Sequence, residues 1–127
     1  MDARSDVDLA GKSFAGGFGY NVADAGDVNN DGYDDVIVGC NQQYYAKGSV
    51  YVFTGGPAMD AVADVAISGN TSYEGFGCSV SGAGDVNNDG YDDVVVGAYM
   101  NKTYDSNAGA IYIYLGGAPM DANWKSW

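Results

Sequence analysis

Two copies of the nine-residue string DVNNDGYDD, at Asp27–Asp35 and Asp85–Asp93, dominate this 127-residue chain. The similarity extends well beyond the string on both sides. The matching segments are Phe18–Gly39 with Phe76–Gly97, Gly48–Gly56 with Gly109–Gly117, and Ser5–Gly11 with Ala63–Gly69. Self-similarity with a period of tens of residues is typical of solenoids, propellers and other repeat arrays. We therefore expect two repeats, at 1–58 and 59–119, followed by a C-terminal tail at 120–127.

Each repeat is predicted to consist of short β-strands. Val50 and Val52 alternate with Tyr51 and Phe53, a pattern of β-branched and aromatic residues that favours a strand packed on both faces. Twenty glycines and two prolines leave no stretch with a sustained helical period. The expected strands are Tyr20–Ala25, Asp34–Val38, Gly48–Thr54 and Asp64–Ser68, then Cys78–Ala83, Asp92–Gly97 and Gly109–Leu115. Four strands per unit with glycine-rich turns make the blade of a β-propeller, so the predicted fold class is all-β.

The acidic spacing inside each string predicts a calcium site. Calcium binds six to eight oxygen ligands, and a loop can supply them from positions 1, 3 and 5 and from a main-chain carbonyl at position 7. Gly32 and Gly90 fall at position 6, where such a loop bends sharply. The bidentate Glu of an EF-hand is missing, because Val38 and Val96 occupy position 12. The predicted ligands are Asp27, Asn29, Asp31, the Tyr33 carbonyl and Asp35, and in the second loop Asp85, Asn87, Asp89, the Tyr91 carbonyl and Asp93. The alternative is a pair of acidic surface turns that bind nothing.

These motifs closely resemble the FG-GAP repeat, the unit of the integrin alpha-chain propeller. The resemblance rests on FG, AGDVNNDGYDD, VIVG or VVVGA, and GxVYVxxGG, and it covers the chain from Ser5 to Gly117. It implies calcium in the turn between the first and second strands of each blade. It also implies that ligand-binding loops lie on the side away from calcium. Propellers of this family usually have seven or eight blades, whereas this chain has two.

Two blades leave strands without partners. The second blade lacks a counterpart to the outer strand at Asp64–Ser68, while Asp6–Ala10 has the pattern of an outer strand without a blade of its own. Because unpaired strand edges are avoided by closure, we expect each N-terminal strand to complete the second blade of a neighbouring copy. Such a head-to-tail contact closes into a cyclic homo-oligomer, with a trimer slightly favoured over a tetramer. The alternative is a fragment of a longer propeller or an engineered repeat pair.

Composition narrows the class of function. The net charge is −12, and eight of the seventeen acidic residues lie in the two strings. Five basic residues are too few to indicate a nucleic-acid partner. The chain has no histidine and a single glutamate, Glu74, so the sequence indicates no enzyme and no catalytic residue. It shows no apolar run long enough for a membrane span and no signal peptide.

Cys40 and Cys78 are the only cysteines, and both are expected at one end of adjacent blades. A disulfide there is sterically conceivable, but two small buried thiols are the favoured interpretation. No cysteine or histidine cluster supports zinc.

The loops opposite the calcium turns are the predicted place for a ligand. They are rich in Asn, Gln, Ser and Tyr, which supply adaptable hydrogen bonds and flat apolar area. The candidate ligand-binding residues are Tyr44, Tyr45, Tyr73 and Tyr104, although each of them alternatively packs between blades. We expect an extracellular, periplasmic or cell-surface module in adhesion or carbohydrate binding, with a glycan or a protein as ligand. The competing interpretation is a purely structural assembly unit without a ligand.

Overall fold

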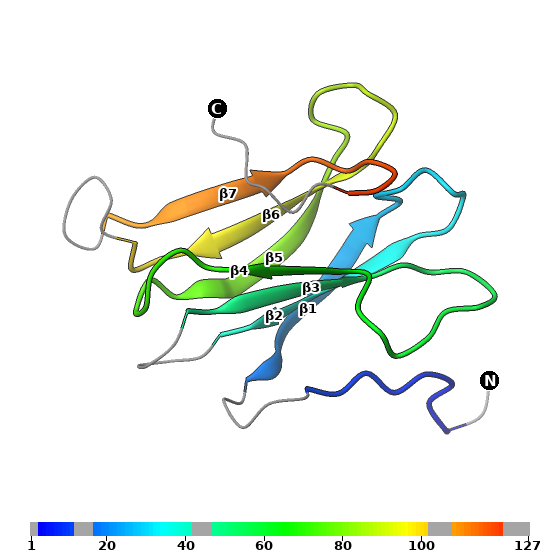
Figure 1. Cartoon of the computed structure of the whole chain (residues 1–127), viewed down its shortest axis with the longest axis horizontal. Helices are drawn as coiled ribbons and strands as arrows, with labels where there is room; N and C mark the ends of the chain where they lie inside the picture. Colours follow the sequence, from blue (N-terminus) through cyan, green and yellow to red (C-terminus); the bar gives the residue numbers. More distant parts are fainter. Residues whose placement is uncertain (1–2, 12–16, 42–46, 102–107, 121–127) are drawn as a thin grey trace.

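The computed structural model describes residues 3–11, 17–41, 47–101 and 108–120, which fold into two antiparallel β-sheets. The first sheet has the strand order β1-β2-β3-β4 and the second β5-β6-β7, so both run in sequence order as blades do (Figure 1). The strands are β1 (Phe18–Gly26), β2 (Asp35–Cys40), β3 (Ser49–Phe53), β4 (Val65–Ser68), β5 (Phe76–Gly84), β6 (Asp93–Ala98) and β7 (Ala110–Tyr114). The prediction of an all-β chain of two such units is confirmed.

The first sheet takes its outer strand from beyond residue 58. β4 pairs with β3, with Val50 opposite Ile67 and Val52 opposite Val65. The division at 1–58 and 59–119 therefore describes the sequence repeat, while the sheet that forms around the first repeat continues to Ser68. Residues 3–11, which include the predicted strand at Asp6–Ala10, form no strand in the single chain.

The main core lies between the two sheets. We call the side of the first sheet that faces the second sheet its rear face, and the opposed side of the second sheet its front face. Because side chains alternate along a strand, Ile37, Val50 and Val52 share the rear face of the first sheet. Val80 and Val96 are paired on the front face of the second sheet. All of these residues belong to one buried cluster, so the contact between blades is the hydrophobic core.

Glycines let the sheets approach to backbone contact. A Cβ atom at Gly39 would overlap with the carbonyl oxygen of Gly77, and a Cβ at Gly48 would overlap with that of Phe76. A Cβ at Gly77, whose φ is +82°, would lie 2.9 Å from the Ser49 carbonyl oxygen. The glycine of the second FG pair, Gly77, is therefore required twice, for its left-handed backbone and for the space in front of it.

Candidate functional site

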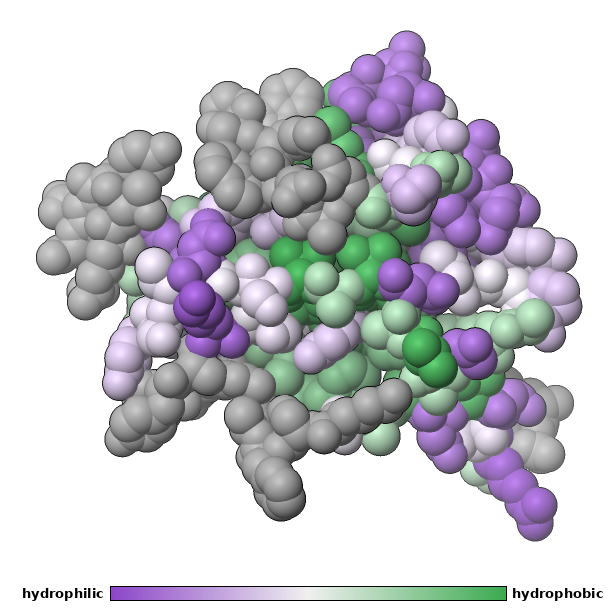
Figure 2. All heavy atoms as spheres, viewed as in Figure 1, coloured by the Kyte–Doolittle hydropathy of each residue, from purple (hydrophilic) through white to green (hydrophobic). Residues whose placement is uncertain are grey.

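The two acidic loops connect β1 to β2 and β5 to β6, and they lie at the same end of the sheets, at the top and upper right of Figure 1. Hydrophilic residues gather at this end in Figure 2. In the first loop the Asp27 carboxylate accepts hydrogen bonds from the N–H groups of Asp31 and Gly32, at 3.0 and 2.8 Å. In the second loop Asp85 accepts from Asp89 and Gly90 at 3.0 and 2.9 Å. The carboxylate of the first Asp in each string therefore holds the loop in its bent shape, through main-chain N–H groups four and five residues later.

The bend in each loop uses left-handed backbone. Asn30 and Asn88 have φ angles of 56° and 57°, and Gly32 and Gly90 have angles of 90° and 92°. Asparagine adopts this conformation more readily than most side chains, and glycine does so without steric cost. The repeated Asn and Gly therefore fix the same loop shape in both blades.

Asn29 carries an observation that fits a cation. Its Nδ2 donates to Asp31 Oδ2 at 3.1 Å, while its Oδ1 is buried and has no hydrogen-bond partner. A buried amide oxygen without a partner is costly, and an oxygen-seeking ion would satisfy it. All the predicted ligands are oxygens, which is the donor set that calcium prefers.

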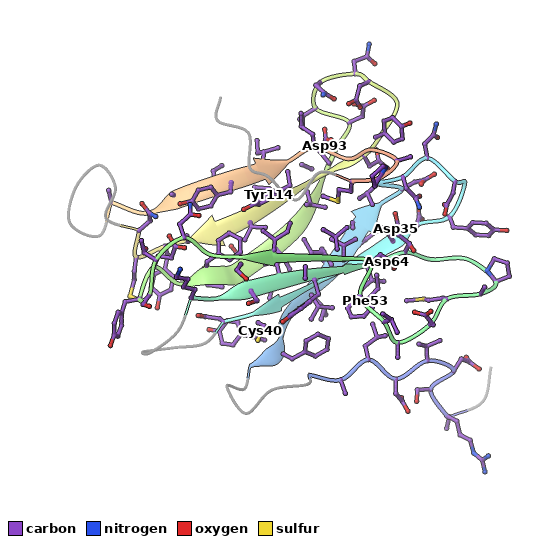
Figure 3. All side chains as sticks on the ribbon, viewed as in Figure 1. Asp35, Cys40, Phe53, Asp64, Asp93 and Tyr114 are labelled. Carbon is purple, nitrogen blue, oxygen red and sulfur yellow. The ribbon has the colours of Figure 1, made fainter. Side chains whose placement is uncertain are left out.

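Asp35 and Asp93, the ninth residues of the strings, are buried anchors between loops (Figure 3). Asp35 accepts from the N–H of Val28 at 2.7 Å and from that of Gly55 at 2.9 Å. Asp93 accepts in the same way from Val86 and Gly116, each at 2.8 Å. Each carboxylate thus ties the start of its acidic loop to the turn after β3 or β7. Sequence reasoning assigned these residues to calcium alone and missed the anchoring role.

Burial and main-chain hydrogen bonds act on the pKa of Asp35 in opposite directions. Burial raises the pKa of Asp35, and the charges of Asp31 and Asp27 raise it further, against the lowering effect of two main-chain hydrogen bonds. In the second loop the Gly90 N–H holds the pKa of the exposed Asp85 below its usual value. A cation in the first loop would relieve the repulsion around Asp35.

Among the described residues, no three or more His, Cys, Asp or Glu side chains lie close enough together to hold a metal ion. The loop carboxylates point instead to main-chain N–H groups, as Asp27 and Asp31 do. The ligand sets predicted for the two loops remain a prediction.

A contact between blades passes through the first loop and was not predicted from the sequence. Asp92 Oδ2 accepts from the N–H of Asp27 at 2.9 Å, and the N–H of Asp92 donates to the Asp27 carbonyl at 3.1 Å. The N–H of Gly117 also donates to the Val28 carbonyl at 2.8 Å. Asp92, the eighth residue of the second string, therefore binds the preceding blade. The only feature of the sequence that could have pointed to this role is that the residue is repeated in both strings.

The opposite end of the sheets holds the predicted ligand loops. Tyr73 is exposed there and has a φ of 65°, while Tyr44, Tyr45 and Tyr104 lie outside the described residues. Tyr99, which the sequence analysis did not select, is also exposed, and its ring packs beside Gly75.

Buried Glu74 organises this end. One of its oxygens accepts from the N–H of Asn70 at 2.8 Å, and the other accepts from Asn101 Nδ2 at 2.7 Å. Asn101 Nδ2 also donates to the Tyr112 hydroxyl at 3.0 Å. The single glutamate of the chain is therefore a structural acceptor that joins two loops, as expected for a buried charged group with hydrogen-bond partners.

Both cysteines are thiols, which agrees with the favoured interpretation. Cys40 is buried and Cys78 is partly buried, with its Sγ 3.6 Å from the Gly97 carbonyl. Among the described residues there is no helix of the length and apolarity that crossing a bilayer requires.

Comparison with known proteins identifies the repeats. The FG-GAP repeat family matches residues 18–53 and 76–114. The chain is 32% identical over 123 residues to integrin alpha-5 of Xenopus laevis, which covers 91% of this chain and 11% of that protein. It is 37% identical over 114 residues to integrin alpha-6 of Homo sapiens, and this match covers 85% of this chain and 9% of that protein. It is 38% identical over 117 residues to integrin alpha-7 of Mus musculus, and this match covers 87% of this chain and 9% of that protein. The chain therefore spans only 9–11% of the length of these relatives. On the strength of the two matched segments, the chain belongs to the FG-GAP repeat family.

Proposed function

We propose that the chain is a calcium-stabilised, non-enzymatic binding module of the extracellular space or cell surface. The observation that carries this proposal is the unpartnered buried Oδ1 of Asn29 inside a loop whose whole donor set is oxygen. The second loop repeats the same hydrogen bonds around Asp85 and Asp89, so we propose two calcium ions per chain.

Within each loop the chain's own residues would have three roles. The first Asp shapes the loop through main-chain N–H groups, and the Asn and the second Asp offer oxygens at its centre. The Tyr33 or Tyr91 carbonyl and the anchored Asp35 or Asp93 complete the proposed set. Bound calcium would supply positive charge that offsets the repulsion among these carboxylates.

The proposed ligand surface is the opposite end, around Tyr73 and Tyr99. Both rings are exposed on loops that Glu74 and Asn101 hold together, and rigidly supported aromatic residues are suited to a glycan or a protein surface. The resemblance to integrin alpha chains supports ligand binding on the side away from calcium.

We also propose that several chains form a closed ring, in which each Asp6–Ala10 segment pairs with β7 of a neighbour. β7 has no outer partner among the described strands, and Val7 is exposed. If the segment pairs as β4 does on β3, Leu9 comes to lie opposite Ile111 of the partner subunit. A trimer would give six blades and a tetramer eight.

The test is a glycan-array and protein-capture screen with the calcium-loaded particle, run beside a calcium titration by calorimetry. Two calcium ions per chain and a ligand sensitive to Tyr73→Asn are expected. Calcium binding without any ligand would favour the alternative of a structural assembly unit. No calcium binding would reject the metal sites.

A further inference from the structure

The two blades have nearly the same sequence but unequal burial. Val80, on the front face of the second sheet, is 7% exposed, whereas its repeat equivalent Val22 on the first sheet is 62% exposed. On the rear faces the relation is reversed, since Val50 is fully buried and its equivalent Ile111 is 70% exposed. Each sheet therefore has one face covered by the other sheet, and its opposite face is open at Val22 or at Ile111. The front face of the first sheet is open only in part, because Val38, Cys40 and Phe53 on that face are buried.

The acidic loops show the same asymmetry. Val28 of the first loop is 1% exposed, but Val86 of the second loop is 42% exposed. Asp92 binds the main chain of Asp27 in the blade before it, whereas its equivalent Asp34 is exposed and has no hydrogen-bond partner among the described residues. The groups compared here, which the internal junction covers on one copy, are thus present a second time in an exposed position.

We propose that the open part of the front face of the first sheet, around Val22 and Asp34, binds the open rear face of the second sheet on another copy of this chain, in the register of the internal junction. This inference rests on the ring proposed above and assigns the surfaces that close it. In this register the Asp34 carboxylate accepts from the N–H of Asp85 of the partner subunit, and the Gly56 N–H donates to the carbonyl of Val86 of the partner subunit.

A groove lies on the front face of the first sheet, where this register would place the acidic loop of the partner subunit. Its volume is about 350 Å³, and Val22, Asp24, Asp34 and Val36 are among its lining residues. The equivalents of two of these, Val80 and Val94, lie in the core cluster that contains Val28. The groove is therefore the place for Val86 of the partner subunit, the repeat equivalent of Val28.

The partner is a second copy because both halves of the junction occur on one chain, at opposite faces. A head-to-tail contact of this kind repeats until it closes. It also covers two apolar faces at once, continuing the contact that already joins the two sheets. Two glycines support this contact. Gly19 has the left-handed φ of its repeat equivalent Gly77, and Gly84 has that of its equivalent Gly26. The space in front of Gly19 and Gly84 is open within the chain, whereas Gly77 and Gly26 lie against the other sheet.

One position prevents an identical copy. Gly82 lies so close to the first sheet that a Cβ there would be 2.7 Å from the Asp24 carbonyl oxygen. Asp24 itself occupies the position of Gly82 on the open front face, so the junction between chains must widen at this point. Asp24→Gly is therefore expected to strengthen assembly.

The test measures native mass in calcium for the full chain and four variants. Val22→Lys and Ile111→Lys place a charge on one open face each and are expected to give folded monomers. Val62→Lys, at an equally exposed valine in the loop between β3 and β4, is the matched control and should assemble normally. Asp34→Ala removes one charge-assisted hydrogen bond and should weaken assembly about tenfold or more.

Mixing the two lysine variants gives the sharpest result. Val22→Lys keeps the rear face of its second sheet intact, and Ile111→Lys keeps the front face of its first sheet intact. These two faces can still bind each other, so the mixture should form a one-to-one dimer that grows no further. A ring that persists in both lysine variants would overturn the junction while leaving the ring itself in place. A wild-type chain that is monomeric in calcium would reject the ring, and with it this junction. A mixture that stays monomeric would overturn the head-to-tail pairing.

Discussion

The first and second blades differ less in sequence than in what lies against them. The same valine position is core at Val80 and surface at Val22, and the same loop is covered at Val28 and open at Val86. The local strands, the bulges of β1 and β5 and the two acidic loops are nevertheless alike. Each blade therefore forms its strands and turns from its own sequence, while the hydrophobic core belongs to the junction between blades.

The largest effect that separates the two environments is expected from Val80→Lys. A lysine there would be buried in the core without an ion-pair partner, at a cost of several kilocalories per mole. That is a large share of the ~5–15 kcal/mol by which domains are stable, so the variant should be largely unfolded. Val22→Lys, the same change at the equivalent position, should keep a cooperative melt. Circular dichroism of both proteins in calcium measures this, and equal losses would show that the two faces are equally buried.

Calcium removal is expected to act on both blades alike, since their loops share one hydrogen-bond pattern. At about 100 times the dissociation constant, each ion stabilises the folded chain by about 2.7 kcal/mol if it does not bind the unfolded chain. Melting with chelator and with added calcium checks this. Asp31→Ala and Asp89→Ala should each delete one ion by calorimetry, and a melting midpoint that ignores chelator would reject the sites.

The anchoring role of Asp93 predicts an effect that does not depend on calcium. Asp93→Ala leaves the part-buried N–H groups of Val86 and Gly116 without acceptors, at a cost of up to about 1–3 kcal/mol each. Asp93→Asn keeps one oxygen acceptor and should lose less. The measurement is denaturant unfolding in chelator, because no calcium is bound there and any role of Asp93 as a calcium ligand cannot contribute. If both variants match the wild type in chelator, the anchor contributes nothing to the apo fold.

At the other end of the sheets, substitutions are expected to change ligand binding and not stability. Tyr73→Asn removes an exposed ring and keeps a residue that accepts the left-handed backbone. Binding to a glycan or protein identified by the screen should weaken while the melting midpoint stays near that of the wild type. Tyr33→Ala, which removes an exposed ring at the end with the acidic loops, is the control. A loss of ligand in Tyr33→Ala, but not in Tyr73→Asn, would move the ligand site to the end with the acidic loops.

The sequence predicted the parts of this structure that depend on local and repeated signals. The strands at Asp35–Cys40 and Asp93–Ala98 follow from apolar runs after an acidic turn, and the loop shape follows from Asn and Gly at fixed positions. The contacts of Asp92 with Asp27 could not be predicted in this way, because they join residues 65 positions apart. Nor could the Glu74–Asn101 bond, since neither residue is repeated in the other blade.

The smallest expected effect concerns Tyr114, whose equivalent in the first blade is Phe53. Burial, and secondarily the charges of Tyr112 and Glu74, raises the pKa of Tyr114 to about 12 from an ordinary value of 10.0. A folded-state pKa above the unfolded value means that this contribution to stability is complete below pH 10.0 and is lost as the pH rises towards 12. Tyr114→Phe should therefore match the wild type at neutral pH, where a ring of nearly the same shape fills the same site. Between pH 10 and 12 the melting temperature of the wild type should fall faster than that of the variant. The reason is that the Tyr114 hydroxyl loses its proton in the unfolded chain in this range, while burial keeps it protonated in the folded chain. The measurement is the difference between the two melting midpoints across this range, with Tyr33→Phe as the control at an exposed tyrosine. Parallel curves for the wild type and Tyr114→Phe would show that the Tyr114 hydroxyl is as accessible as it is in the unfolded chain.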